Sequence, residues 1–143
     1  MTEQTFHGCK VALFVGERLL IILRDDKPDI PWPNLWDFPG GGREGEETPE
    51  ETLIREVWEE VGLTLVSEDL IWKKGYPASF DPSYRVIFFV AKLPASAKAE
   101  VVFGNEGQGW KLVDVAEYLA MDRIIPHYPD RLRDWAVATG VSV

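Results

Sequence analysis

Three glutamates are spaced so that a single helix would bring their carboxylates together. Glu56, Glu59 and Glu60 stand at positions i, i+3 and i+4, and residues with this spacing share one face of an α-helix. Since like charges at such short range weaken a helix, a bound divalent cation is the simplest compensation. Carboxylate oxygens suit hard ions such as Mg²⁺ or Mn²⁺. The pattern therefore predicts a metal site, although a charged helical face is more often only solvated.

Local signals predict the helix that would carry these carboxylates. Thr48 and Glu51 have the spacing of a capping box, and Pro49 between them suits the first helical position. Gly62 suits a left-handed C-terminal cap, so the helix is predicted to end at Val61. The apolar residues of this stretch form a separate arc that is expected to pack on a core: Leu53, Ile54, Val57, Trp58 and Val61.

The segment from Gly41 to Leu63 resembles the Nudix box. That motif is a glycine, five residues, a glutamate, seven residues, and then Arg-Glu-apolar-any-Glu-Glu-any-Gly-apolar. Every specified position is filled here, by Gly41, Glu47, Arg55, Glu56, Val57, Glu59, Glu60, Gly62 and Leu63. The resemblance implies an α/β (α+β) domain with the Nudix fold, a mixed β-sheet sandwiched between α-helices, over residues 1–143.

The same resemblance implies roles for individual residues. Glu59 and Glu60 would be metal ligands, and Glu56 would be a further ligand or the residue that handles the attacking water. Arg55 would orient these carboxylates as part of the catalytic machinery, although an ordinary surface ion pair is the simpler interpretation. The carbonyl of Gly40 would coordinate the metal, or the glycines there would only make a tight turn.

Residues outside the box complete the predicted site. Glu106, in a glycine-rich loop, resembles the loop glutamate of the MutT-like branch and is the expected fourth carboxylate; otherwise it is a loop acid without a role. Arg24 would bind a phosphate, or pair with the acidic residues that follow it. Trp36 and Phe38 lead into the glycine loop and are the expected stacking platforms for a base, although most aromatic side chains in a sheet are core.

Composition restricts the class of partner. The 143 residues carry a formal net charge of −9, and the eight glutamates and two arginines of residues 41–63 account for most of it. This acidity argues against binding a nucleic-acid polymer. The N-terminus does not resemble a signal peptide, and no apolar run is long enough to span a bilayer. We therefore expect a cytoplasmic protein without membrane contact, and the sequence permits a homodimer. Cys9, the single cysteine, is expected to be a passive strand residue.

Apolar runs between turn residues predict the remaining elements. Strands are predicted over Lys10–Val15, Leu19–Leu23, Leu35–Phe38, Ile71–Phe80, Tyr84–Leu93, Val101–Phe103 and Trp110–Val113. Further helices are predicted over Val115–Met121 and from about Pro129 to just before Gly140.

The predicted function is Mg²⁺-dependent hydrolysis, with Mn²⁺ as an alternative ion, of a nucleoside diphosphate linked to another moiety. A nucleoside triphosphate or a related nucleotide would be the substrate, and water would attack a phosphorus. The alternative is a catalytically inactive Nudix module that binds a nucleotide and regulates a partner. A structural protein with an acidic helix would instead show no saturable metal binding.

Overall fold

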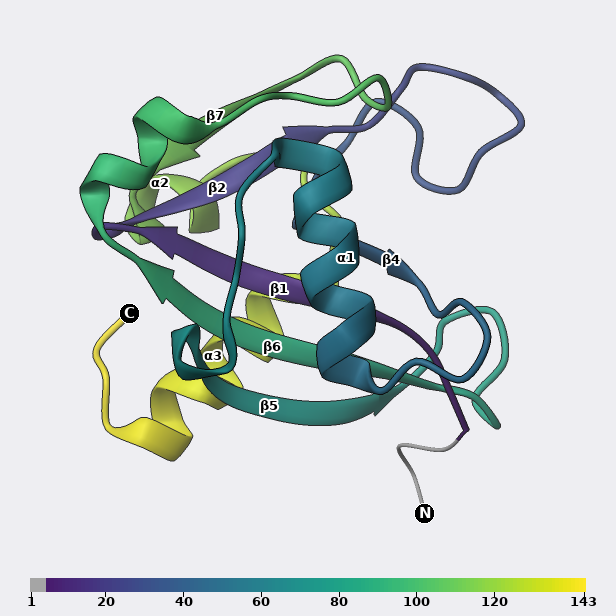
Figure 1. The fold of residues 1–143 in the computed structure, drawn as a ribbon. Helices are drawn as coiled ribbons and strands as arrows, with labels where there is room; N and C mark the ends of the chain where they lie inside the picture. The colour runs from purple at the N-terminus through teal and green to yellow at the C-terminus, as the bar shows by residue number, and fades with distance from the viewer. Residues whose placement is uncertain (1–4) are drawn as a thin grey trace.

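The computed structural model describes residues 5–143 and forms one mixed sheet with helices on both faces (Figure 1). Strand β1 (Phe6–Val15) lies at its centre, antiparallel to β2 (Arg18–Leu23) and parallel to β6 (Arg85–Leu93). The order is β3-β2-β1-β6-β5, with β4 paired to β1 and β7 to β2. The outer strands are β3 (Trp36–Asp37), β4 (Gly40–Gly42), β5 (Leu70–Pro77) and β7 (Gly109–Val113).

Two hydrophobic clusters separate the layers. Helix α1 (Pro49–Val61) covers one face of the sheet, while α3 (Tyr128–Thr139) covers the other and α2 (Val115–Leu119) lies near β2 and β7 (Figure 1). Strand β1 sends Val11 and Leu13 toward α1, and Ala12 and Phe14 toward α3. Because both faces of β1 are covered, its sequence is a continuous apolar run rather than an alternating one. The predicted fold class is confirmed.

Helix α1 begins and ends where its capping signals predict. Thr48 Oγ1 accepts the Glu51 N–H at 3.1 Å, and the Glu51 carboxylate accepts the Thr48 N–H at 2.8 Å. Gly62 caps the C-terminus with φ of 70°. The predicted apolar arc is wrong in one member, since the side chain of Trp58 is 61% exposed. Leu53, Val57 and Val61 form the stripe that packs the helix on the core. Trp58 projects about 100° from the centre of that stripe.

The predicted strand over Val101–Phe103 is also wrong. A short 3₁₀-helix, Ala95–Glu100, precedes this segment. The backbone of the segment itself hydrogen-bonds to the end of α1 instead of to a strand. The Val102 N–H donates to the Val61 carbonyl at 2.9 Å, and the Gly104 N–H donates to the Glu60 carbonyl at 2.8 Å. Carbonyls of the last helical turn have no partner within the helix, so they are free to accept these bonds.

Charged residues protect the exposed edge of the sheet. Strand β5 is an edge strand, and it carries Lys73 and Lys74, which disfavour pairing with another sheet.

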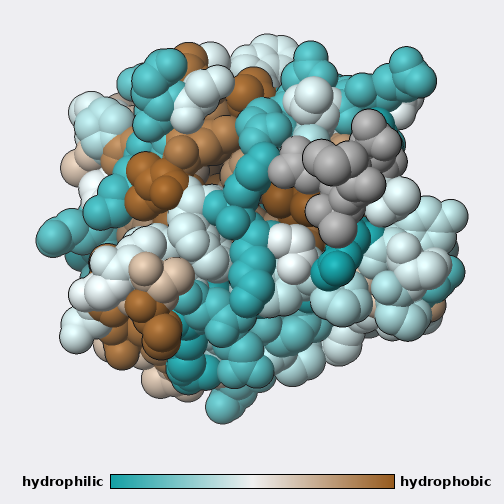
Figure 2. Space-filling view, turned by 90° about the horizontal axis from the view of Figure 1, so that it is seen from below, coloured by the Kyte–Doolittle hydropathy of each residue, from teal (hydrophilic) through white to brown (hydrophobic). Residues whose placement is uncertain are grey.

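Figure 2 shows the molecule from below, where apolar side chains lie in separate groups divided by hydrophilic ones. Between residues 5 and 143, no helix combines the length and the apolar character that crossing a bilayer requires. Cys9 is buried, and its thiol donates to the Pro49 carbonyl at 3.3 Å.

Candidate metal and nucleotide site

Glu60 is held against the backbone of the glycine loop. The Gly40 N–H donates to its Oε1 at 2.7 Å. Burial raises the pKa of Glu60 to about 7, although the charge of nearby Lys10 opposes this effect. A carboxylate desolvated in this way is stabilised in its charged form by a cation. The Gly40 carbonyl faces the same lysine, with 3.4 Å between the oxygen and Lys10 Nζ.

Glu56 lies directly against Gly41. A Cβ placed on Gly41 would stand 2.5 Å from the carboxyl carbon of Glu56, so glycine is what leaves room for this carboxylate. Burial raises the pKa of Glu56, and hydrogen bonding to Arg55 acts in the opposite direction. The glycines here therefore serve close approach as well as the turn.

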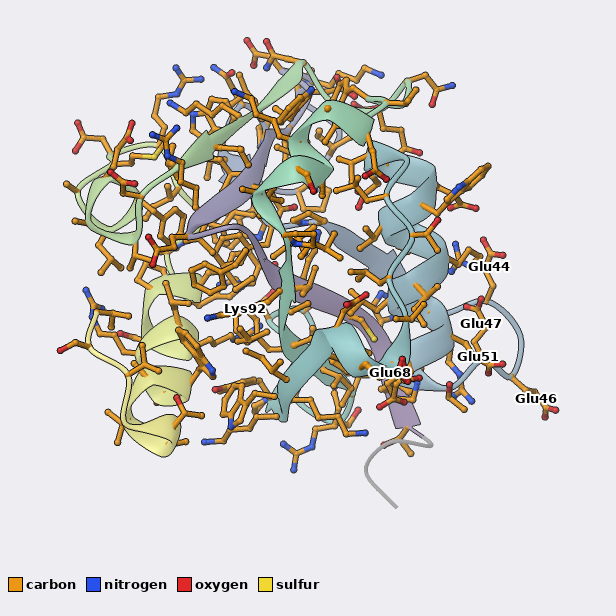
Figure 3. The ribbon with its side chains drawn as sticks, turned by 60° about the vertical axis from the view of Figure 1, so that its left-hand side comes forward. Glu44, Glu46, Glu47, Glu51, Glu68 and Lys92 are labelled. Carbon is orange, nitrogen blue, oxygen red and sulfur yellow. The ribbon has the colours of Figure 1, made fainter. Side chains whose placement is uncertain are left out.

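Arg55 orients several groups at once. Its Nε and Nη2 atoms donate to the two oxygens of Glu47 at 2.7 and 3.0 Å, and Nη2 also donates to the Gly42 carbonyl at 2.8 Å. Nη1 donates to Glu56 and Glu59, each at 3.0 Å. Hydrogen bonding to Arg55 lowers the pKa of Glu47 to about 2. Such a fork is far more restrictive than an exposed ion pair. Figure 3 shows the acidic loop and first turn that flank this clamp, with Glu47 among their labelled side chains.

The glycine-rich loop brings Glu106 to the same helical face. A cavity of about 260 Å³, hereafter the carboxylate cavity, is lined by Glu56, Glu59, Glu60, Asn105 and Glu106. The loop is fixed at both ends, because the Gly104 N–H bonds to α1 and the Gln108 N–H donates to the Leu23 carbonyl at 2.8 Å. Helix and loop thus contribute four carboxylates to one space.

The donor set fits a hard divalent cation. Its side-chain donors are oxygens, and the burial of Glu60 favours a compensating positive charge. Within residues 5–143, no three His, Cys, Asp or Glu side chains already converge on one point. The clamp explains this, since Arg55 holds Glu56 and Glu59 in ion pairs at 3.0 Å.

A second cavity adjoins the first and adds two cationic side chains. This middle cavity, of about 360 Å³, shares Glu60 and Glu106 with the carboxylate cavity, and its other charged lining residues are Arg24, Asp25, Lys27 and Asp37. Arg24 Nη1 donates to Asp37 Oδ2 at 3.1 Å and its Nε donates to the Pro31 carbonyl at 3.0 Å. Its carboxylate partner is therefore Asp37 and not one of the two aspartates that follow it. Cations beside a metal-binding cluster suit a phosphate chain.

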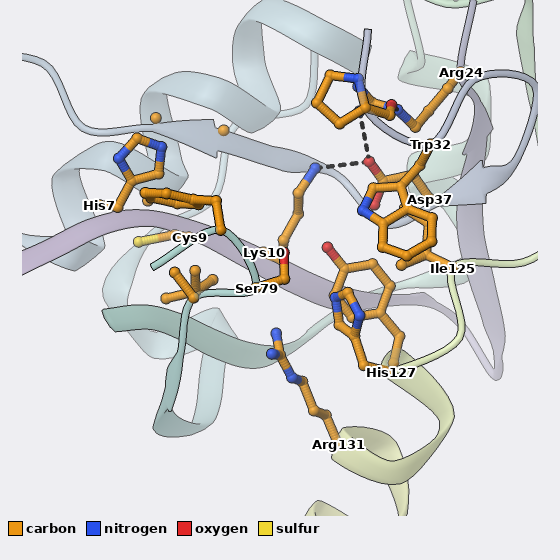
Figure 4. A pocket seen from close by; sticks show the side chains of 18 residues that line it. His7, Cys9, Lys10, Arg24, Trp32, Asp37, Ser79, Ile125, His127 and Arg131 are labelled. Carbon is orange, nitrogen blue, oxygen red and sulfur yellow. Dashed lines mark hydrogen bonds and ion pairs between the residues drawn. The ribbon is translucent and has the colours of Figure 1, made fainter. Parts of the chain in front are cut away.

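A third cavity extends from the middle one. It has a volume of about 350 Å³ and shares Arg24 and Asp37 with the middle cavity. We call it the aromatic cavity; Figure 4 shows it with Lys10 and Arg24 both bonded to Asp37. Its other prominent side chains are His7, Trp32, Phe80, His127, Tyr128 and Arg131. Their shared lining residues place the three cavities in a row from the carboxylates of α1 to the side chains of α3.

Two of the expected substrate contacts are packed in the core. Phe38 lines the middle cavity, but it is only 1% exposed and its ring stacks on Tyr118 and Tyr128, so the prediction that this ring stacks on a base is wrong. Trp36 packs against the same cluster, with Lys111 Nζ 4.8 Å from its ring centroid, and lines none of the three cavities. Successive strand residues face opposite sides of a sheet, so Asp37 is the residue of this strand that reaches the site.

Sequence reasoning missed several residues that line the site. Lys10 sits in an apolar strand, and Asp37 lies between two aromatic residues; a charge embedded in an apolar strand is the signal that could have identified them. Asp37 is 5% exposed and bonds to Lys10 Nζ at 2.8 Å. Burial lowers the pKa of Lys10, but Asp37, Tyr128 and Glu60 together outweigh burial and the net shift of this pKa is upward. Trp32, His127 and Arg131 carry no local signal, because only tertiary folding brings them together.

Comparison with known proteins adds a family. Residues 9–134 match the model of the NUDIX domain. An RNA pyrophosphohydrolase from Marinomonas sp. (strain MWYL1) is 43% identical over 58 residues, which are 37% of this chain and 36% of that protein. A MutT-like protein from Streptomyces ambofaciens is 43% identical over 72 residues, 48% of this chain and 43% of that protein. The chain thus spans less than half the length of these two relatives.

A solved structure shares the fold. The MutT protein from Methanosarcina mazei Go1 superposes with a TM-score of 0.74 at 21% identity, covering 96% of this chain and 97% of the other. Identity at this level establishes the architecture and leaves activity to be argued from the site. The family model itself covers most of the sequence, and the protein therefore belongs to the NUDIX domain (Nudix) family.

Proposed function

We propose that the protein is a Mg²⁺-dependent pyrophosphohydrolase that cleaves a nucleoside diphosphate linked to another moiety. The observation that carries this proposal is the junction of the carboxylate and middle cavities, which share Glu60 and Glu106. Ligands for a divalent ion thus adjoin Arg24 and Lys27, which can bind phosphate. Relatives named RNA pyrophosphohydrolase and MutT-like support the same reaction class.

Helix α1 and the glycine-rich loop that carries Glu106 would together hold the ion. Glu56, Glu59, Glu60 and Glu106 supply carboxylate oxygens, and the Gly40 carbonyl is a candidate fifth ligand. When bound, a divalent ion neutralises phosphate charge and lowers the pKa of a coordinated water. Mn²⁺ satisfies the same oxygen donors.

The protein's own groups would position the reactants. Arg24 and Lys27 hold the phosphate chain beside the carboxylates, which aligns a phosphorus with the attacking water. Arg55 Nη1 donates to Glu56 Oε2, so Oε1 is the oxygen left either to bind the ion or to accept a proton from that water. Because the same arginine also binds Glu47 and the Gly42 carbonyl, its orientation is fixed from outside the site.

A substrate screen and two variants test the proposal. Nucleoside triphosphates, nucleotide sugars, ADP-ribose and dinucleoside polyphosphates should be assayed with Mg²⁺ and with Mn²⁺, and reaction in ¹⁸O-labelled water would locate the attacked phosphorus. Glu59→Gln and Glu60→Gln should each lower turnover by several orders of magnitude. Glu50→Gln is the matched control, because Glu50 lies on the same helix, lines none of the three cavities and pairs with Lys73 in a solvent-accessible bridge of 2.8 Å.

Two outcomes would contradict the proposal. Full turnover in both variants would show that these carboxylates take no part in the reaction. Saturable nucleotide binding without phosphate release under either ion would instead favour the alternative, a Nudix module that regulates a partner.

A further inference from the structure

Arg131 is a buried guanidinium without an anionic partner. Only 8% of the residue is exposed, and it projects from α3 into the aromatic cavity (Figure 4). Within residues 5–143, the structure shows no hydrogen bond or ion pair to its side chain, whereas Lys10 and Arg24 in the same cavity share Asp37. The nitrogen atoms of Arg131 are not fully enclosed, since among residues 5–143 the Tyr118 hydroxyl is the only fully buried side-chain N or O atom without a hydrogen bond. The N–H groups of Arg131 are therefore available to a ligand.

Two tyrosines hold this guanidinium in place without neutralising it. The Arg131 Cζ atom lies 4.6 Å from the ring centroid of Tyr76 and 5.5 Å from that of Tyr128. Burial lowers the pKa of Arg131, and Tyr128 and Tyr76 offset this effect only in part. Guanidinium groups donate from a planar fork and accept nothing. A partner that presents two adjacent acceptors matches such a fork best.

The walls of the aromatic cavity suit a flat ring. Trp32 is 38% exposed and Phe80 61% exposed, and these rings come from separate loops. His7 packs edge-on to Phe80 at 4.7 Å, and His127 packs edge-on to Trp32 at 5.9 Å between ring centroids. Trp32 also adopts a positive φ of 51°, which is costly for a bulky residue and persists where the surroundings require it. A volume of about 350 Å³ lies within the range of small-molecule pockets, roughly 300–1,000 Å³.

The charge of the aromatic cavity also favours a ligand that carries acceptors. Lys10, Arg24 and Arg131 line it, with Asp37 as the carboxylate among the lining residues. Burial, followed by the charge of Arg131, lowers the pKa of His127, which keeps that ring neutral near pH 7. A chain of net charge −9 thus builds a cavity with an excess of donors and positive charge. Such a lining favours a ring whose edge carries acceptors.

We propose that Arg131 is a specificity-determining residue that selects a nucleobase with two adjacent acceptors, such as guanine with its O6 and N7, over adenine. Adenine presents an amino donor beside N7, which would oppose the N–H groups of Arg131. The inference rests on the proposed function, because it names the base of the nucleotide that would be hydrolysed.

The test compares bases that differ at this edge. GTP and ITP carry both O6 and N7, whereas ATP has N7 but an amino group in place of O6. The wild-type protein should therefore hydrolyse GTP and ITP with a kcat/KM about ten- to hundredfold above that for ATP. Arg131→Met should abolish this ratio. Arg131→Lys keeps the charge but loses the fork, and should also lose most of the preference. Arg133→Met is the matched control on the same helix, since Arg133 is exposed and pairs with Asp130 at 3.4 Å.

A binding measurement without turnover completes the test. Calorimetry with GMP and AMP, in the absence of divalent ions, should show the same preference in the wild type and in Arg133→Met, and its loss in both Arg131 variants. An equal loss of affinity for GMP and AMP in the Arg131 variants would overturn the inference, because it would make Arg131 a packing residue. Full preference in Arg131→Lys would overturn it in favour of charge recognition, for example of a phosphate.

The two proposals fail in different ways. Selective GMP binding without hydrolysis of any nucleotide would refute the proposed function and leave the role of Arg131 standing. Efficient hydrolysis with a base preference that does not depend on Arg131 would refute this inference alone.

Discussion

Replacing Gly41 by alanine should damage the candidate site while sparing the fold. The added Cβ would stand 2.5 Å from the carboxyl carbon of Glu56 and 2.6 and 2.7 Å from its oxygens. Gly41 does not use the left-handed region that only glycine adopts easily, so its backbone accepts alanine. The atoms that must move are the far end of a flexible side chain, and that end is the carboxylate proposed to bind metal or handle the water.

The geometry sets the magnitude. Ordinary contact with a Cβ begins at 3.4 Å, so the Glu56 carboxyl carbon must retreat by about 0.9 Å from its 2.5 Å position. A misplacement of about 1 Å in a catalytic group costs roughly a hundredfold in rate, or about 2.7 kcal/mol of transition-state stabilisation. The free energy of unfolding should change by less than about 1 kcal/mol, because alanine also reduces the entropy of the unfolded chain.

The assay measures kcat/KM with Mg²⁺ on the best substrate of the screen, beside urea unfolding of the same sample. Gly109→Ala is the control, since a Cβ there meets no atom within 4 Å. Gly40→Ala is the contrasting variant. Its Cβ would meet the Cys9 carbonyl oxygen and its φ is 139°, so it should lower stability sharply. Full turnover in a folded Gly41→Ala protein would refute the reasoning that the position of Glu56 limits the reaction.

Two further predictions concern stability. Burial raises the folded-state pKa of Glu60 to about 7 from an ordinary 4.5. Between these two pH values the metal-free folded state keeps a proton that the unfolded state has lost. The free energy of unfolding should therefore fall by roughly 2–3 kcal/mol between pH 4.5 and pH 7. Glu60→Gln should flatten that fall in urea titrations with a chelator, and an unchanged slope would contradict the shift. On α1, Leu53→Ala should cost about 2–5 kcal/mol of unfolding free energy, because Leu53 is fully buried. Trp58→Ser should cost no more than about 0.5 kcal/mol in the same titration; equal costs would show that Trp58 is packed after all.

The parts of the site that could be predicted are those encoded locally. The limits of α1 follow from Thr48, Glu51 and Gly62, which act within one helical turn of the ends that they fix. Glu56, Glu59 and Glu60 follow from helical spacing. Glu106 required the family resemblance, because nothing between it and the helix reveals that the two approach.

The remaining residues depend on tertiary structure. The Asp37 side chain bonds to Lys10 and Arg24 while the Phe38 ring packs in the core, because one step along a strand reverses the side chain, and sequence alone does not say which face is the core. Arg131 and Trp32 meet across the aromatic cavity although almost a hundred residues separate them in the chain. The Val101–Phe103 segment is apolar, yet the free carbonyls of α1 draw it away from any strand partner.

That same attachment makes the end of α1 and the Glu106 loop a single cooperative unit. Val102 and Gly104 occupy the last helical carbonyls, and a Cβ at residue 104 would lie 2.6 Å from the Glu59 carbonyl oxygen, so the two backbones are in direct contact. Fraying of the final turn would release the loop, and release of the loop would expose the turn. The two sources of carboxylates are therefore assembled or lost together. An ion bound between them would slow amide hydrogen exchange in both segments to the same extent.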